Sequence, residues 1–474
     1  MIGFMAVLAG CGSSKERLII LQTGRMAGNV YPLEVRGVAP LQHYPYLAGY
    51  VKQVREEARR EGAEVLLIDS GDSLLGSFAS YATGAQNMVT LFNTLGYDAL
   101  FLGNLDANLE EAMVEKIQAP LLIPFVRESG EPALAGARLA LKLRKGPTEL
   151  VLLPNFYGNF DPAEAPQRFP IWFGTATGKV KPLRNYGPVL AGLQPINEKT
   201  LTLFHWMKFE SGGLEPSSYV EQLKGMGVTL ILAHSIYSSS ERDTWKQRDY
   251  SGWGLPISEN ILRQNRGFTV ARVDLLKGKK GWEVERPARI IPMNANTAPA
   301  DPILVDAIKP FAKQIQQADV VLGELSESVD EEALLQSHLL TLTGVPGANM
   351  VFYSAASVRG SLDKGKLTAS KLYNAIPWTG ELSLIELRPE QLAALRQMKG
   401  YALLSKKGSE SKPVLVSSRY FTRLLQDSLK LTEDQIRPAG VNNEFEFAKQ
   451  AYQSGRSLPV SKPQLGDWIY ESLD

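Results

Sequence analysis

Short apolar runs alternate with amphipathic stretches in the N-terminal part of the chain. Runs of strand length lie at residues 18–21, 65–68 and 99–102, and continuous apolar runs of this length are typical of strands that are buried on both faces. Residues 46–61 instead repeat their apolar side chains at helical spacing and stop at Gly62. This pattern predicts an amphipathic helix that ends at a glycine cap.

The alternation continues further along the chain. Residues 88–95 repeat the helical spacing before Gly96, so a second amphipathic helix should precede the third strand. Later apolar runs of strand length lie at residues 150–153, 201–204, 230–233 and 268–275. Strands that alternate with helices predict βαβ units, and we expect the later strands to form a second sheet.

Regular periodicity is lost between residues 154 and 200, which are rich in Pro and Gly and carry aromatic clusters at 155–160 and 169–173. An irregular stretch of this length is typical of a functional loop or an insertion. Its aromatic side chains could cover a ligand or a partner. The favoured alternative is a satellite hydrophobic cluster on the main body.

A second domain is expected after a linker helix. Asp301 and Pro302 are a typical helix start, with Asp as N-cap and Pro in the first turn, and Pro310 should kink the helix. The expected units are a tether over 1–17, a first domain over 18–300 with an insertion at 154–200, a linker helix over 301–318 and a second domain over 319–474.

Composition narrows the class of protein. A chain of 474 residues is long enough for two or three domains. Its 51 basic and 50 acidic side chains nearly cancel, which argues against a nucleic-acid-binding protein, because such proteins need a basic surface. The apolar share of 44% is ordinary for a globular protein with a full core.

The only cysteine, Cys11, follows an apolar run over residues 1–10 that is too short to span a bilayer. Leu8-Ala9-Gly10-Cys11 resembles a bacterial lipobox, although no Lys or Arg precedes the run as in an ordinary signal peptide. The resemblance implies lipidation of Cys11 and a membrane-anchored protein on the periplasmic or extracellular face of a bacterial envelope. The alternative is a buried strand with an inert thiol.

Residues 93–106 read Asn-Thr-Leu-Gly-Tyr-Asp-Ala-Leu-Phe-Leu-Gly-Asn-Leu-Asp. This stretch resembles the block of the 5'-nucleotidase family, within the calcineurin-like metallophosphoesterases, that ends in Gly-Asn-His-Glu. Residues 349–359, 372–378 and 387–392 resemble blocks of the family's C-terminal domain, in the same order. The resemblance implies an α/β fold, with an N-terminal four-layer α/β/β/α sandwich, a linker helix and a C-terminal α+β domain.

The resemblance also implies two divalent cations, such as Mn or Zn, that would activate a water molecule and polarise a phosphoryl oxygen. The family's first motif, Asp-x-His-Gly, corresponds here to residues 25–28, where Arg25 and Ala27 replace the Asp and the His. Its Gly-Asp motif is kept with Asp72. Its Asn is kept as Asn104, but Leu105 replaces the catalytic His.

Histidines are too few for the family's site. The chain has four, His43, His205, His234 and His338, and only His234 falls at a matching position, after the run 230–233. No counterpart of the family's Gly-His-x-His exists. Because each Zn or Mn ion needs about four ligands, the weak candidates Asp72, Asn104 and His234 do not suffice, and no bound metal is predicted. The favoured alternatives are loop support at strand ends for Asp72 and Asn104 and a structural histidine for His234.

Arg25 is predicted to pair with Asp72, since a guanidinium could neutralise a carboxylate that the metals once held. The alternative is an Arg25 that points to solvent.

The C-terminal domain is altered as well. The family's loop Asn-x-Gly-Gly-Ile-Arg corresponds to residues 354–359, which read Ser-Ala-Ala-Ser-Val-Arg. Ser354, Ser357 and Arg359 are the candidate ligand-binding residues, with Arg359 able to grip an anion. Tyr420 and Phe421 lie near the expected position of the rings that hold a base. Core aromatics on a strand are the commoner explanation for these two, and we favour it.

Three functions fit these substitutions. We favour an envelope lipoprotein without phosphoesterase chemistry that serves as a non-catalytic binding or assembly subunit for a protein partner, with no cofactor. The alternative is a hydrolase of nucleotides or related phosphate esters with an atypical divalent-metal site. The third is a protein that binds a nucleotide or phosphate through Arg359 without hydrolysis.

Overall fold

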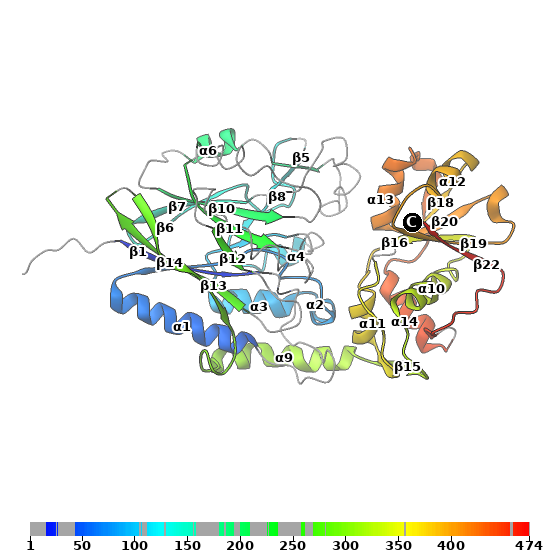
Figure 1. Ribbon diagram of the computed structural model, residues 1–474, viewed down its shortest axis with the longest axis horizontal. Coiled ribbons are helices and arrows are strands. Elements are labelled where there is room, and N and C mark those ends of the chain that lie inside the picture. Colours follow the sequence, from blue (N-terminus) through cyan, green and yellow to red (C-terminus); the bar gives the residue numbers. More distant parts are fainter. Residues whose placement is uncertain are drawn as a thin grey trace, which may run out of the picture.

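The computed structural model describes residues 16–24, 26, 43–103, 106, 111–127, 129–154, 156–157, 180–183, 186–193, 200–208, 225, 227–235, 257–260, 269–279, 281–354, 357–455 and 458–473. Two domains lie side by side, and the long helix α9 (Pro302–Ala318) runs along the first and reaches the second (Figure 1). No helix in the described ranges has the length and apolar character needed to cross a membrane.

The first sheet of the N-terminal domain contains, in spatial order, β14 (Gly281–Pro292), β13 (Thr269–Gly278), β1 (Arg17–Thr23), β2 (Glu64–Asp69), β3 (Ala99–Phe101) and β4 (Leu121–Leu122). Strands β1 to β4 are parallel, and β13 and β14 are antiparallel additions. In β1, Leu18 and Ile20 pack on one face while Ile19 and Leu21 pack on the other. The prediction of strands buried on both faces is therefore confirmed here.

The second sheet contains β12 (Ile257–Asn260), β11 (Val228–Ser235), β10 (Leu201–Lys208), β7 (Thr148–Leu153) and β6 (Leu141–Lys145), with β8 (Phe156–Tyr157) beside β10. Its inner face packs against the first sheet, where Leu152, Leu203 and Leu232 share one core with Leu66 and Phe101. A separate pair consists of β5 (Phe125–Arg127) and β9 (Val180–Pro182). The second sheet expected from the sequence is thus present.

Helices cover the other face of the first sheet. They are α1 (His43–Glu61), α3 (Gln86–Leu95) and α9, and their apolar stripes form one core with that face. Short helices are α2 (Phe78–Thr83), α4 (Glu111–Val114) and α6 (Gly187–Gly192). Helix α3 ends at Gly96, as predicted, in a left-handed conformation with φ of 62°. The helices and the two sheets are three of the four expected layers. The segments that directly follow β10 and β11, residues 209–224 and 236–256, lie outside the described residues.

The linker helix begins as its sequence predicts. The Asp301 carboxylate accepts the Leu304 backbone N–H at 3.1 Å, which is the bond expected of an N-cap. Pro310 lies inside α9, and the helix continues to Ala318.

The C-terminal domain is built on a sheet with the strand order β21 (Ile436–Pro438), β18 (Leu382–Glu386), β20 (Val414–Ser418), β16 (Met350–Ser354), β19 (Tyr401–Lys406) and β22 (Trp468–Leu473). Around it lie α10 (Glu331–Leu342), α11 (Ala369–Ala375), α12 (Pro389–Leu395), α13 (Arg419–Ser428) and α14 (Glu444–Gln453), with the pair β15 (Val321–Leu325) and β17 (Gly365–Thr368). Tyr420 and Phe421 lie on α13, so the expectation of a strand at these residues was wrong.

Candidate functional site

The loops that follow β2 and β3 meet at the carboxyl edge of the first sheet, where the retained family motifs lie. Ile68 pairs with Ala99, so the loop that carries Gly71 and the loop that carries Gly103 leave the sheet side by side. A Cβ atom on Gly103 would lie 2.4 Å from the Asp72 backbone nitrogen. Only glycine permits this approach, so close backbone contact between the two motifs explains their glycines.

Asp106 holds these two loops together. Its carboxylate accepts backbone N–H groups from Asp72 at 2.7 Å, Leu74 at 2.8 Å and Gly103 at 2.9 Å. The residue is 1% exposed. Burial, with the nearby negative charge of Asp72, raises the pKa of Asp106 to about 6 despite these three bonds. The carboxylate therefore serves the backbone, a role that the sequence did not reveal.

Asp69 is the last residue of β2 and lies at the same edge of the sheet. Its carboxylate accepts the Thr23 hydroxyl at 2.6 Å, the Gly71 backbone N–H at 2.9 Å and the Ser73 hydroxyl at 3.0 Å. Burial raises the pKa of Asp69 to about 7, although these hydrogen bonds act in the opposite direction. In the sequence, Asp69 is visible only as an aspartate at the end of a buried strand, before Ser-Gly, and this pattern did not indicate its role.

The predicted metal ligands are only partly described. Asp72 is 2% exposed and has a left-handed backbone with φ of 55°, a conformation that costs energy in a residue with a Cβ atom. His234 lies near the carboxyl end of β11, where its backbone pairs with Asn260 of β12. Arg25, Asn104 and Leu105 lie outside the described residues, so the pairing of Arg25 with Asp72 stays a prediction. Cys11 also lies outside them.

Among the residues whose side chains the structure describes, no three His, Cys, Asp or Glu side chains come together as a metal site would require.

Arg359 lies on the C-terminal domain, and its charge interacts with that of Asp72 in the N-terminal domain. Burial lowers the pKa of Arg359, while Tyr373 and Asp72 act to raise it. Arg359 is nevertheless exposed to solvent. Since a guanidinium can be flanked by protein and still contact water, Arg359 is accessible to solutes. Arg359 is thus an exposed cation whose charge interacts with that of Asp72.

The other candidate ligand residues are less available. Ser357 is 2% exposed, and its backbone carbonyl accepts the Trp378 indole N–H at 3.1 Å. Phe421 is 1% exposed and packs against the rings of Phe352 and Tyr353. This burial favours the core-aromatic alternative for Phe421. Ser354 ends β16 and is half-buried, and the side chain of Tyr420 is outside the described residues.

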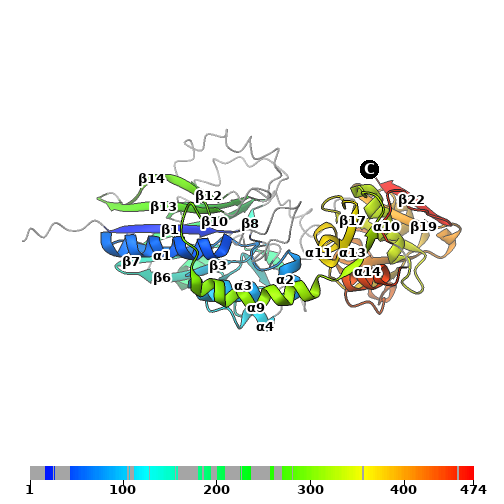
Figure 2. The ribbon, with the colours of Figure 1, turned by 90° about the horizontal axis from the view of Figure 1, so that it is seen from below.

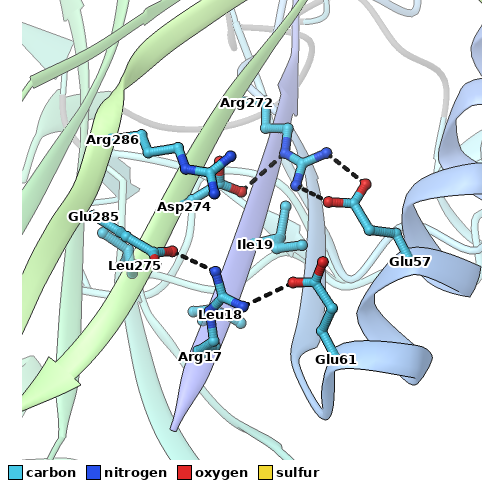
Figure 3. Close-up of a pocket in the computed structure, with 10 residues that line it drawn as sticks. All are labelled: Arg17, Leu18, Ile19, Glu57, Glu61, Arg272, Asp274, Leu275, Glu285 and Arg286. Atoms are coloured by element: carbon cyan, nitrogen blue, oxygen red, sulfur yellow. Dashed lines mark hydrogen bonds and ion pairs between the residues drawn. The ribbon is translucent and has the colours of Figure 1, made fainter. Parts of the chain in front are cut away.

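A pocket toward the amino end of β1 is lined by charged side chains (Figure 3). Arg272 donates to Glu57 at 2.6 and 2.9 Å and to Asp274 at 2.9 Å. Arg17 likewise bridges Glu61 and Glu285, at 2.8 and 2.6 Å. Since these charges already pair with one another, the pocket is a structural ion network and offers little to a ligand.

A buried polar cluster in the C-terminal domain was also missed. The Glu444 carboxylate is fully buried, lies 2.8 Å from His338 Nε2 and accepts the Tyr353 hydroxyl. The three side chains come from α14, α10 and β16. His338 is therefore a core histidine that is held through its Nε2 atom.

Comparison with known proteins identifies the fold. No family model matches the chain, and no curated protein matches it in sequence. Among solved structures, the chain is similar to a 5'-nucleotidase precursor from Thermus thermophilus, with 14% identity, coverage of 94% of this chain and 97% of that one, and a TM-score of 0.63. A putative 5'-nucleotidase from Staphylococcus aureus matches at 12% identity, with coverage of 92% and 96% and a TM-score of 0.63.

The chain has the two-domain 5'-nucleotidase fold. A further similar structure is that of the Thermus thermophilus sulfate thiohydrolase SoxB, with 14% identity, coverage of 94% and 95%, and a TM-score of 0.60. All three matches extend over both domains. They confirm the predicted fold, in which a metallophosphoesterase-like domain is followed by a linker helix and a C-terminal domain. At sequence identities this low, the similarity shows the fold alone.

Proposed function

We propose that this chain is a lipid-anchored protein of the bacterial cell envelope that keeps the 5'-nucleotidase fold without its phosphoesterase chemistry. The observation that carries the proposal is the substitution of ligand positions by Arg25, Ala27 and Leu105. A cation at position 25 would repel divalent metals. Leu105 can neither bind a metal nor donate a proton.

The fold supports the motif alignment behind this argument. Gly71 and Gly103 follow β2 and β3 at one edge of the sheet and lie in contact, as the alignment of these two motifs requires. The fold alone does not decide the reaction, because one similar structure is named a 5'-nucleotidase and another a sulfate thiohydrolase. Function must therefore be argued from the site.

The described carboxylates near the site are engaged by protein groups. Asp106 accepts three backbone N–H groups, and Asp69 accepts two hydroxyls and one backbone N–H. Burial raises their pKa values to about 6 and about 7. Hydrogen bonds within the protein thus hold the two loops, which supports a fold that does not depend on metals.

Metal content and hydrolysis, measured on one sample of purified full-length protein, test the proposal. We expect well below one equivalent of Mn, Zn or Fe per chain, no hydrolysis of 5'-AMP or bis(p-nitrophenyl) phosphate with added Mn²⁺, and no rise of the melting temperature with Mn²⁺, since only binding to the native state raises it. Two tightly bound metals with phosphoester hydrolysis would overturn the proposal in favour of a hydrolase with an atypical site.

The anchor is tested separately. If Cys11 is lipidated, Cys11→Ser should move the protein from the membrane to the soluble envelope fraction. An unmodified Met1 terminus on protein from the native cell would contradict lipidation.

A second candidate function is non-hydrolytic binding of a nucleotide or phosphate, and the exposure of Arg359 favours it. Titration calorimetry with 5'-AMP and with inorganic phosphate should then show binding that Arg359→Ala abolishes. Arg388→Ala is the matched control, because the Arg388 side chain is 60% exposed and lies elsewhere on the same domain. Equal binding by all three proteins would exclude a role for Arg359.

A further inference from the structure

The first turn of α2 belongs to the N-terminal domain in sequence, but its apolar side chains pack in the core of the C-terminal domain. Phe78 and Ala79 are 1% and 0% exposed and form one cluster with Leu334, Phe352 and other residues of that domain. Helix α2 lies at the junction of the domains beside α11 in both views (Figures 1 and 2). The two domains therefore share a core at this point.

Four rings make the contact, and we name them the aromatic clamp: Phe78, Tyr81, Tyr373 and Phe445. Tyr81 stacks on Tyr373 at 5.1 Å between ring centroids and meets Phe445 edge-on at 5.2 Å. Phe78 meets the same two rings edge-on at 6.0 and 6.5 Å. These are the favourable geometries for aromatic pairs, so each ring of α2 contacts both rings of the C-terminal domain.

Polar bonds surround the clamp. The Tyr81 hydroxyl donates to Glu446 at 2.5 Å, and Lys449 also donates to Glu446, at 2.7 Å. From the linker helix, Gln314 donates to the Ala82 carbonyl at 2.9 Å. A polar rim around a buried aromatic centre is the usual anatomy of a stable interface.

Helix α2 is also fixed to its own domain. The Thr83 hydroxyl donates to Asn87 at 2.9 Å, and Asn87 is fully buried on α3. Phe311 of α9 packs against the cores of both domains. A movement of one domain against the other would have to expose Phe78 or detach α2 from α3.

We propose that the aromatic clamp locks the two domains in a single arrangement. Tyr373 is central to this lock, because its ring contacts both Phe78 and Tyr81 of α2. The proposal does not depend on the loss of hydrolysis and goes beyond it.

Calorimetric unfolding and small-angle scattering of the full chain test the lock. Wild-type protein should unfold in one cooperative transition, and its scattering should fit a single domain arrangement with and without inorganic phosphate. Phe78→Ser and Phe445→Ala, one in each domain, should each split unfolding into two transitions and expose α9 to limited proteolysis.

Phe92→Ala is the matched control, because Phe92 is equally buried but packs within the N-terminal core, against Tyr97. It should lower the melting temperature and keep a single transition. If Phe78→Ser fails to fold, Phe445→Ala and the wild-type measurements still show whether the clamp locks the two domains. Two separated transitions in the wild type, scattering that requires several domain arrangements, or equal splitting by Phe92→Ala would overturn the proposal.

Discussion

Asp106 accepts the backbone N–H of Asp72 at 2.7 Å, and this bond joins the loop after β3 to the loop after β2. In the motif resemblance, Asp106 stands where the 5'-nucleotidase family has the glutamate that ends Gly-Asn-His-Glu. The shorter Asp106 side chain is 1% exposed and reaches three backbone N–H groups in all. Asp106 therefore joins the two loops through hydrogen bonds to their backbones.

Replacement of Asp106 should destabilise the protein. Asp106→Ala leaves three buried N–H groups without their acceptor, and we expect a loss of roughly 2–4 kcal/mol because each orphaned donor is costly, partly offset by removal of a buried charge. Chemical denaturation monitored by circular dichroism measures this. The control is Asp363→Ala, since Asp363 is exposed and its removal should cost less than about 0.5 kcal/mol. Equal effects of the two variants would contradict this role of Asp106.

The sequence predicted the framework well because its signals were periodic. The strand runs at 18–21, 65–68 and 99–102, and the helix over 88–95, reappear as β1, β2, β3 and α3. Each is buried on the faces that the apolar pattern requires. Glycine at a left-handed cap, as at Gly96, also gave a correct helix end.

The parts that were missed depend on tertiary contacts. Nothing in the local pattern of Phe78 indicates that its ring enters the core of a domain that begins far along the chain. Tyr420 and Phe421 lie in the first turn of α13, which begins at Arg419 directly after the end of β20, so the apolar pattern did not separate the strand from the helix. For the candidate site, the motifs located the glycines and Asp72. They could not reveal that Asp69 and Asp106 serve backbone groups, because that depends on how the two loops meet.

Asp69 should make stability depend on pH. Its pKa rises from 3.8 to about 7 on folding because of burial, so between these values the native state binds more protons than the unfolded state. Stability is therefore greatest on the acidic side of this window and falls as pH rises through about 7, by at most about 1.4 kcal/mol per pH unit. The melting temperature should be higher at about pH 5.5 than at about pH 8.

A variant isolates this contribution. Asp69→Asn is neutral at every pH in the window, and its amide can still accept the Gly71 N–H and donate to the Thr23 or Ser73 hydroxyl. The slope of the melting temperature against pH should become flatter in this variant. Asp363→Asn, at an exposed site, should keep the wild-type slope. An unchanged slope in Asp69→Asn would show that Asp69 is ionised throughout.

Arg272 should be a major source of stability in the N-terminal domain. Its side chain is 8% exposed and donates to Glu57 and to Asp274, which is 7% exposed. Burial alone would lower the pKa of Arg272, but its hydrogen bonds to these carboxylates outweigh burial and raise it. Among the described residues, Arg272→Ala would leave Asp274 with the half-exposed Arg289 as its ion-pair partner. Removal of one member of a buried ion pair costs about 3–5 kcal/mol.

We therefore expect Arg272→Ala to lower the free energy of unfolding by about 3 kcal/mol. Arg272→Lys should recover only part of it, because an ammonium cannot donate to both Glu57 oxygens and to Asp274 from one planar group. Arg388→Ala is the control, since Arg388 and its partner Glu390 are 60% and 68% exposed and such surface pairs contribute under about 1 kcal/mol. Denaturant titration of the three variants in low and high salt measures these differences. The Arg272→Ala loss should change less with salt than the Arg388→Ala loss, because Arg272 and Asp274 are largely shielded from solvent. A loss as small as that of Arg388→Ala would mean that the network around β1 is solvated and contributes nothing to folding.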